Sequence, residues 1–404
     1  MASIPLRNPS ILLALLIAVS TLTPAQTLTV LHTFNSTDGA FPNGGLVHGS
    51  DGNLYGTASG GGAHGFGTVF KITTSGKFTS IYSFAGGIGD GAYPMSSVIR
   101  DSSGNIYGMT QSGGPADNLG GVVFKITSAG KESVLHFFTG GADGGNPEGD
   151  LIRDSSGNLY GVTAGGGNLH CNASYFTGCG VVFKLSASGT ETVLHTFQGG
   201  SDGANPWGGL VMDSSGNLYG STENGGRYSA GQIFKISASG KKTVVHNFDP
   251  GVNMDGANPR DPLTFGSGGI LYGTTFRGGD LSVSWCGSIG CGTVFKLDTH
   301  DVLTTLHSFE GPPSDGDTPY GAVARDSAGN LYGIAADGGN EYFGGIVYKL
   351  DLSGNETILH NFTQGDDGWE PSGRLYVDKS GTVYGAASLS DGPDGNGVIF
   401  KIVP

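Results

Sequence analysis

One pattern recurs seven times along this chain of 404 residues, and it limits the possible folds more than any other feature. Each copy contains, in the same order, an LHxF segment, a DGxxP segment, a hairpin of the type DSSGNLYG and a G(x)VFK(I/L) segment. The lysines of the last segment lie 51 to 61 residues apart and are Lys71, Lys125, Lys184, Lys235, Lys296, Lys349 and Lys401. A period of this length indicates a propeller or another array of repeated units.

Each repeated unit has the pattern of four short β-strands. In the fourth copy, the runs GLVMD, NLYGST, GQIFKIS and KKTVVHNF are separated by an SSG turn, a longer loop and an ASG turn. Apolar runs bounded by Gly and Ser turns are typical of hairpins and are too short for helices. The 76 glycines also disfavour long helices. We therefore predict an all-β fold, a seven-bladed β-propeller of four-stranded blades.

The first strand predicted after residue 25 corresponds to the last strand of a repeated unit, not to its first. Residues 28–34 (LTVLHTF) match the last strand of a unit, whereas residues 397–402 (GVIFKI) match the third strand. In a closed ring, the N-terminal strand would complete the last blade and remove an open sheet edge. We expect residues 26–404 to form a single propeller domain closed in this way, with an open array of repeats as the alternative.

The first 25 residues have the features of a secretory signal peptide. Arg7 precedes an apolar run over residues 11–19, and Thr23 and Ala25 provide the small residues of a cleavage site. A transmembrane anchor would need about 20 apolar residues, which is longer than this run. We expect cleavage after Ala25 and a monomeric protein, secreted or periplasmic, that has no membrane span in its mature form.

The four cysteines lie in two elongated loops between the second and third strands of their units. Cys171 and Cys179 belong to the third unit, and Cys286 and Cys291 to the fifth. In an exported protein such pairs indicate local disulfides, Cys171 with Cys179 and Cys286 with Cys291. Zinc is the alternative, because His170 adjoins Cys171, although neither loop has CxxC spacing.

The net charge of the chain and the positions of its histidines and aspartates also limit which partners and cofactors are expected. The net charge of −14 would repel nucleic acid. We expect the recurring histidines, such as His195, to pack and hydrogen-bond between blades, because each belongs to a different outer strand. The repeated aspartates, such as Asp202 and Asp255, are expected to accept backbone hydrogen bonds in turns. No metal and no cofactor is expected, with calcium at these aspartates as the alternative.

The composite GGxDGANPxGGLVxDSSGNLYGTTxxGG, followed by GTVFKI, resembles a known family of tandem repeats. These are the Gloeobacter/Verrucomicrobia-type (GloVer) repeats of exported bacterial proteins called choice-of-anchor proteins. The resemblance covers nearly all of the chain after residue 25. It implies an exported protein with propeller-like repeats, and it supplies no catalytic residues. Some members carry a C-terminal sorting anchor, which the final GVIFKIVP does not contain, so surface attachment is not expected.

A functional site is expected where the repeats differ from one another. Immediately after the repeated Pro, the seven units have Asn43, Met95, Glu148, Trp207, Arg260, Tyr320 and Ser372, whereas their surroundings stay nearly constant. Asp150, Asp261 and Arg374 follow within a few residues. This position should lie at the start of each innermost strand, around the mouth of the central channel. Neutral drift between repeats is the alternative explanation.

Two classes of function fit this ring of variable residues. The first is a non-catalytic binding module for an extracellular glycan or peptide, because aromatic faces stack and charged groups orient a ligand. The second is a secreted glycan-acting hydrolase or lyase in which an acidic pair such as Glu148 and Asp150 acts as acid and base near Arg260. An enzyme should concentrate acidic groups and a base in one pocket. A binding module needs only aromatic and polar groups around the ring.

Overall fold

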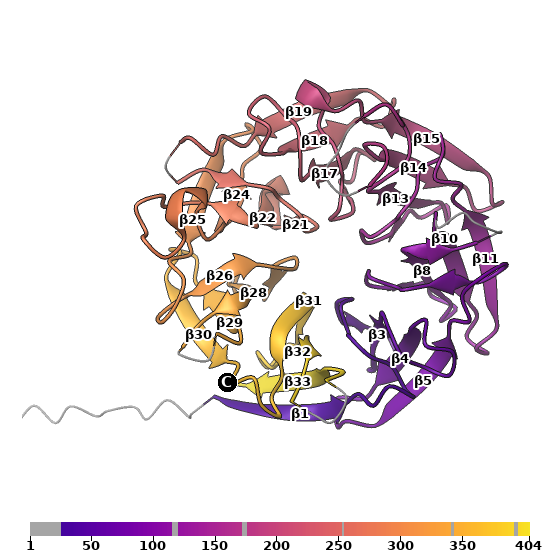
Figure 1. The fold of residues 1–404 in the computed structure, drawn as a ribbon, viewed down its shortest axis with the longest axis horizontal. Coiled ribbons are helices and arrows are strands. Elements are labelled where there is room, and N and C mark those ends of the chain that lie inside the picture. Colours follow the sequence, from indigo (N-terminus) through magenta and orange to yellow (C-terminus); the bar gives the residue numbers. More distant parts are fainter. Residues whose placement is uncertain (1–25, 115–119, 172–175, 253, 341–342, 392–394) are drawn as a thin grey trace, which may run out of the picture.

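The main strands form seven sheets arranged around a central axis (Figure 1). The computed structural model describes residues 26–114, 120–171, 176–252, 254–340, 343–391 and 395–404. The predicted signal peptide, residues 1–25, lies outside the described residues. Each sheet has four antiparallel main strands, and the regular helices within the described residues are three short 3₁₀ turns. The predicted seven-bladed, four-stranded, all-β propeller is thus confirmed.

The blades are named here by their order along the chain, and their strands run from the innermost to the outermost. Blade 1 contains β2 (Val47–His48), β3 (Leu54–Ala58), β4 (Thr68–Ile72) and β5 (Phe78–Ser83). Blade 2 contains β7 (Ile99–Arg100), β8 (Ile106–Thr110), β10 (Val122–Ile126) and β11 (Glu132–Phe137). Blade 3 contains β12 (Ile152–Arg153), β13 (Leu159–Thr163), β14 (Val181–Leu185) and β15 (Glu191–Thr196).

The remaining blades follow the same order. Blade 4 contains β16 (Val211–Met212), β17 (Leu218–Thr222), β18 (Gln232–Ile236) and β19 (Lys242–Asn247). Blade 5 contains β21 (Thr264–Phe265), β22 (Leu271–Thr275), β24 (Thr293–Leu297) and β25 (Leu303–Ser308). Blade 6 contains β27 (Ala324–Arg325), β28 (Leu331–Gly338), β29 (Ile346–Leu350) and β30 (Glu356–Asn361), with β26 (Gly316–Pro319) also pairing with β28. Blade 7 contains β31 (Trp369–Val377), β32 (Val383–Leu389), β33 (Val398–Val403) and β1 (Thr27–Thr33).

A few short elements lie outside these strands. Two small ribbons pair β6 (Gly91–Ala92) with β9 (Ser112–Gly113) and β20 (Gly256–Ala257) with β23 (Arg277–Gly278). The 3₁₀ turns are η1 (Gly200–Asp202), η2 (Ser267–Gly269) and η3 (Gly287–Ile289). Within the part of the chain that the structure describes, no helix is long and apolar enough to span a membrane.

The aspartate of the DSSGNLYG segment explains why each inner hairpin forms. In blade 3, Oδ1 of Asp154 accepts hydrogen bonds from the backbone N–H groups of Ser156 and Asn158, both at 2.9 Å. Its other oxygen accepts the hydroxyl of Tyr160 at 3.1 Å. These donors hold the pKa of Asp154 below its usual range, although partial desolvation opposes them. Gly157 has φ +87°, which only glycine adopts freely, and so allows the tight turn.

The core is divided among the gaps between adjacent blades. In each gap, the Phe of an LHxF segment packs against the aromatic ring of the next VFK segment. The ring centroids of Phe138 and Phe183 are 5.0 Å apart, and those of Phe362 and Phe400 are 5.3 Å apart. All four side chains are fully buried. Since burying an aromatic ring contributes several kcal/mol, these contacts hold neighbouring blades together.

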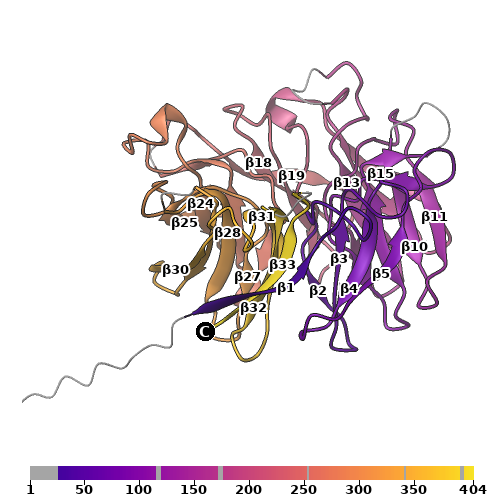
Figure 2. The same ribbon diagram turned by 60° about the horizontal axis from the view of Figure 1, so that its bottom comes forward.

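The N-terminal strand lies at the outer edge of blade 7. It pairs antiparallel with β33, from Thr27 opposite Val403 to Thr33 opposite Val398 (Figure 2). Val30, which lies opposite Phe400, packs against the apolar cluster between blades 6 and 7. The expected position of this strand is therefore observed. That the strand is required to close the ring stays a prediction, and it is tested below.

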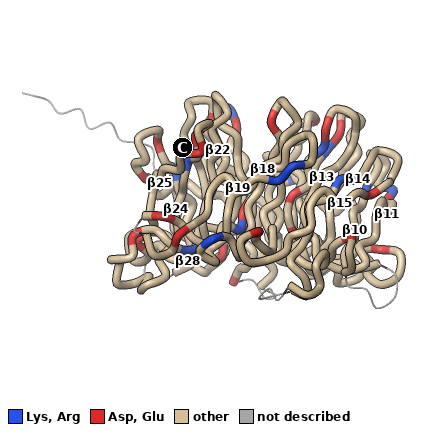
Figure 3. Tube along the Cα trace, turned by 90° about the horizontal axis from the view of Figure 1, so that it is seen from above, with Lys and Arg blue, Asp and Glu red and all other residues tan. Residues whose placement is uncertain are grey.

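Both cysteine pairs form the predicted disulfides, Cys171 with Cys179 and Cys286 with Cys291. Each bond lies in the connection between the second and third strands of its blade, on the face where the outer strand of one blade connects to the inner strand of the next. We call this face the loop face. Disulfides are typical of proteins in oxidising compartments. Acidic and basic residues are spread around the ring and over both faces rather than gathered in one patch (Figure 3).

Candidate functional site

The variable residues predicted at the channel mouth line a single cavity on the loop face. Its volume is about 90 Å³, and its walls come from all seven blades. All eight residues predicted as ligand-binding contribute to these walls: Asn43, Met95, Glu148, Asp150, Trp207, Arg260, Tyr320 and Arg374. Asp261 also lines the cavity. The seventh member of the ring, Ser372, is turned away, and its hydroxyl donates to the carbonyl oxygen of Pro42 at 3.0 Å.

Glycines next to the variable residues let neighbouring blades approach closely at the axis. Each variable residue is followed by a short segment in which neighbouring blades touch at the axis. A Cβ atom at Gly149 would overlap with the backbone nitrogen of Gly209 in the next blade. The side chain of Asp150 holds blades 2 and 3 together, since its Oδ1 accepts a hydrogen bond from the backbone N–H of Ser97 at 2.8 Å. In five of the seven units the residue directly after the variable position is glycine, and this glycine reflects backbone contact at the axis.

Two carboxyl groups in the cavity titrate closer to neutrality than ordinary acids. Partial burial raises the pKa of Glu148 to about 7, even though its Oε1 accepts a hydrogen bond from Gln111. Asp261 is 9% exposed, and burial raises its pKa to about 6, although Oγ1 of Thr274 donates to it at 3.0 Å. Burial and the nearby acids also raise the pKa of Tyr320 to about 12. At neutral pH Tyr320 therefore keeps its proton and can donate a hydrogen bond.

Arg260 and Arg374 bring positive charge to the cavity, and a buried partner holds Arg260 in place. Nε and Nη2 of Arg260 donate to Oε1 of Glu223 at 2.8 and 2.6 Å. The guanidinium carbon lies 4.0 Å from the centroid of the Phe276 ring and 5.8 Å from that of Trp207. The centroid of the Phe176 ring lies 5.6 Å from that of Trp207. Trp207 is partly exposed and lines the cavity, so part of its ring can be contacted by a ligand.

Four residues of this site were not among the sequence predictions. Gln111, Glu223 and Phe276 occupy one position of the repeat, four residues after the hairpin tyrosine, where the other units have Ser59, Ala164, Ala336 and Ser388. This position varies as strongly as the one after Pro, so the same comparison of repeats could have found it. Phe176 lies within the loop closed by the Cys171–Cys179 disulfide, and no repeated feature of the sequence marks it.

The cavity combines an aromatic ring, two arginine side chains, hydrogen-bonding groups and two carboxyl groups with raised pKa values. Such a combination in a concave site is characteristic of functional sites. Within the described residues, the one group of three His, Cys, Asp or Glu atoms close enough to hold a metal ion lies elsewhere, between blades 5 and 6.

The fold is shared with solved structures of low sequence identity. The extracellular domain of a protein described as a hybrid two-component system from B. thetaiotaomicron matches with a TM-score of 0.56 and 13% identity, over 94% of this chain and 41% of that chain. Puromycin hydrolase matches with a TM-score of 0.53 and 10% identity, over 88% and 51% of the two chains. A protein described as a 6-phosphogluconolactonase from Bacteroides fragilis matches with a TM-score of 0.51 and 16% identity, over 90% and 98%. These likenesses establish the propeller fold.

Sequence comparison identifies the family directly. No curated protein sequence matches the chain with significant similarity. The family model of the Gloeobacter/Verrucomicrobia repeat, in contrast, matches residues 18–174, 90–286 and 281–404, which overlap and together cover nearly all of the chain. The repeated segments, the propeller and this match agree, and the chain belongs to the Gloeobacter/Verrucomicrobia repeat family.

Proposed function

We propose that this protein is an exported binding module that holds one sugar-sized, hydroxyl-rich group of a glycan in its central cavity. The observation that carries the proposal is the convergence of all eight residues predicted as ligand-binding on that cavity. Neutral drift between repeats would not by itself bring together an aromatic face, a guanidinium and several carboxyl and amide groups. A sugar ring requires this combination, because it stacks its C–H face on an aromatic ring and binds polar groups with its hydroxyls.

The volume of the cavity limits the size of the bound group. A space of about 90 Å³ holds on the order of six to nine water molecules, at about 10–15 Å³ each. One sugar ring therefore fits better than a longer chain. The rest of a glycan would extend over the loop face, where the disulfide-closed segment carrying Phe176 borders the cavity.

A second candidate function is acid–base catalysis on a glycan in the same cavity. It is favoured by the raised pKa values of Glu148, about 7, and Asp261, about 6. A carboxyl group with a pKa near the working pH can both donate and accept a proton. Of the pair first predicted, Glu148 and Asp150, we retain Glu148 as acid or base and replace Asp150 with Asp261, whose pKa is raised.

The proposal is tested by titrating the mature protein with a panel of monosaccharides and oligosaccharides in a calorimeter. Trp207→Ala is expected to weaken binding at least tenfold, since it removes the stacking face. The matched control is Trp285→Ala, because Trp285 is 57% exposed on the loop face and does not line the cavity. Equal affinities for wild type and Trp207→Ala, or no binding across the panel, would contradict the proposal.

Product release from the same panel separates the two functions. A binding module leaves each glycan unchanged. An enzyme releases shorter products, and Glu148→Gln would then abolish turnover while retaining affinity. Turnover that is unchanged in Glu148→Gln would exclude the acid–base role of this residue.

A further inference from the structure

At the rim of the ring, each gap between blades repeats one arrangement of side chains. In six of the seven units the His of an LHxF segment faces the Asp of the DGxxP segment that follows it, and in the second unit Tyr82 takes the place of His. His195 and Asp202 are 3.0 Å apart, and His307 and Asp315 are 3.1 Å apart. The next blade adds a residue from the start of its outer strand, six positions before its own LHxF phenylalanine. Along the chain this third position is Leu28, Phe78, Glu132, Glu191, Lys242, Leu303 and Glu356.

The gap between blades 3 and 4 shows what the His–Asp pair accepts at this third position. Nζ of Lys242 lies 2.7 Å from Oδ1 of Asp202 and 2.6 Å from its carbonyl oxygen. The ammonium group is nearly buried, since the Lys242 side chain is 8% exposed. A cation therefore occupies this point of the repeat and neutralises the aspartate, whose pKa falls to about 2 despite its partial burial.

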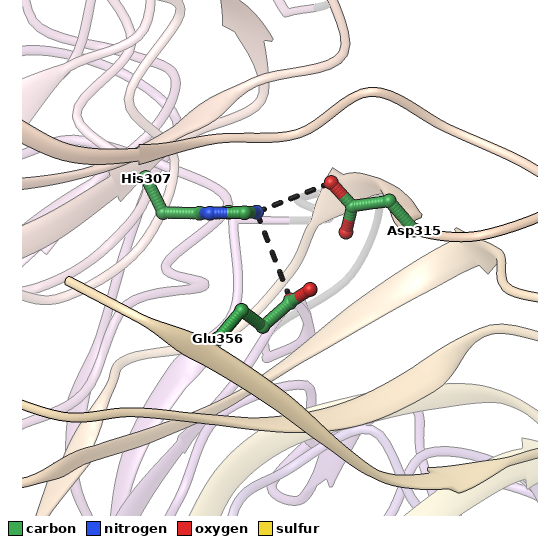
Figure 4. A group of neighbouring side chains, drawn as sticks. All are labelled: His307, Asp315 and Glu356. Carbon is green, nitrogen blue, oxygen red and sulfur yellow. Dashed lines mark hydrogen bonds and ion pairs between the residues drawn. The ribbon is translucent and has the colours of Figure 1, made fainter.

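The gap between blades 5 and 6 has a carboxylate where Lys242 stands in the earlier gap. Nε2 of His307 lies 3.1 Å from Oδ2 of Asp315 and 3.7 Å from Oε1 of Glu356 (Figure 4). The Asp315 and Glu356 side chains are 8% and 14% exposed. Oε1 of Glu356 is buried and has no hydrogen-bond partner among the described residues. Two carboxylates thus share a largely buried site that lacks the ammonium group found in the equivalent gap.

We propose that His307, Asp315 and Glu356 bind a divalent transition-metal cation such as Zn²⁺, which bridges blades 5 and 6. The three ligand atoms lie within 4.8 Å of one another, and no other such group exists within the described residues. Zinc bonds of about 2.0–2.1 Å in a tetrahedron place neighbouring ligand atoms about 3.3 Å apart. The observed separations of 3.1 and 3.7 Å lie on either side of this value. One imidazole nitrogen with two carboxylate oxygens and water suits Zn²⁺, whereas Ca²⁺ prefers six to eight oxygens.

The rival occupant of this site is a proton. Burial and the neighbouring Asp315 raise the pKa of Glu356 to about 7. The pKa of His307 is also raised, because Asp315, Glu356 and Glu310 outweigh its burial. A metal ion and protons both neutralise the two carboxylates, so they compete for this site. Titrating the protein with the metal ion distinguishes them.

The first experiment adds Zn²⁺ alone to chelator-treated protein at pH 7.5. We expect one Zn²⁺ per chain after dialysis, and a rise in melting temperature of about 3 °C at a hundredfold excess of Zn²⁺ over its dissociation constant. Ca²⁺ at the same concentration should produce no rise. A protein that retains no Zn²⁺ and shows no thermal shift would overturn the proposal in favour of the proton.

Three variants assign the effect to this gap. Glu356→Leu and Glu356→Lys place there the residue types that the fold itself uses at Leu303 and Lys242, so both should fold and lose the bound Zn²⁺ and the thermal shift. The matched control is Glu191→Leu, at the same position in another gap, which should keep both. Zn²⁺ bound as tightly by Glu356→Leu as by wild type would overturn the assignment.

Discussion

The ion pair between Arg260 and Glu223 allows a quantitative test of how the cavity is held together. Glu223 is 2% exposed, and it faces two donors of Arg260. In Arg260→Ala this carboxylate loses its charged partner within a buried site, which typically costs about 3–5 kcal/mol. In Glu223→Ala the guanidinium, whose side chain is 21% exposed, still reaches water, so we expect a smaller loss of about 1–3 kcal/mol.

The double variant Arg260→Ala/Glu223→Ala should cost about 2 kcal/mol less than the sum of the two single variants, because neither charge is then left without its partner. The assay is equilibrium urea unfolding at pH 7, followed by tryptophan fluorescence, with the four proteins measured under identical conditions. Single-variant losses that add within about 0.5 kcal/mol would refute this reasoning. So would a larger loss for Glu223→Ala than for Arg260→Ala.

Three further predictions concern pH, backbone strain and ring closure. The raised pKa of Glu148 means that the folded state binds its proton more tightly than the unfolded state does, so the free energy of unfolding falls as pH rises from about 4.5 to about 7. Glu148→Gln lacks this titration. Between pH 5 and pH 8, its free energy of unfolding, measured in urea, should therefore rise by about 2 kcal/mol relative to that of wild type. Thr318 has φ +54°, a backbone conformation that strains a β-branched residue, and three other units have Asn at this position, as at Asn205. Thr318→Asn should relieve this strain and raise the melting temperature. A fall in the melting temperature would contradict this prediction. Deleting residues 26–33 should expose the edge of β33 and lower the melting temperature by at least about 5 °C, and an unchanged value would show that β1 does not close the ring.

Features that repeat along the chain could be predicted from the sequence, because each copy of the repeat folds in the same local environment and shows the same pattern of residues. The blade count, the strand order and the position of residues 28–34 beside the last blade followed from the repeat and its phase. Both disulfides followed from pairs of cysteines within single loops. The cavity-lining position after Pro was predictable because chemical variety at one place in a constant frame indicates a site that differs between blades.

Contacts that join different units were harder to predict, since they depend on how neighbouring blades are staggered. Gln111 and Arg260 each contact a residue of the adjacent blade, 37 positions away in the chain. Glu356 meets His307 across a separation of 49 residues, and nothing in the sequence of one repeat indicates this contact. The histidines were expected to hydrogen-bond between blades, whereas their observed partners include the aspartate of the following DGxxP segment.

The most direct test of the central claim is a crystal structure of the protein with the tightest-binding sugar of the panel. The account predicts one sugar ring in the central cavity, stacked on Trp207 and within hydrogen-bond distance of Glu148 or Arg260. A sugar bound only on the outer surface of the ring, with the cavity holding water alone, would contradict it.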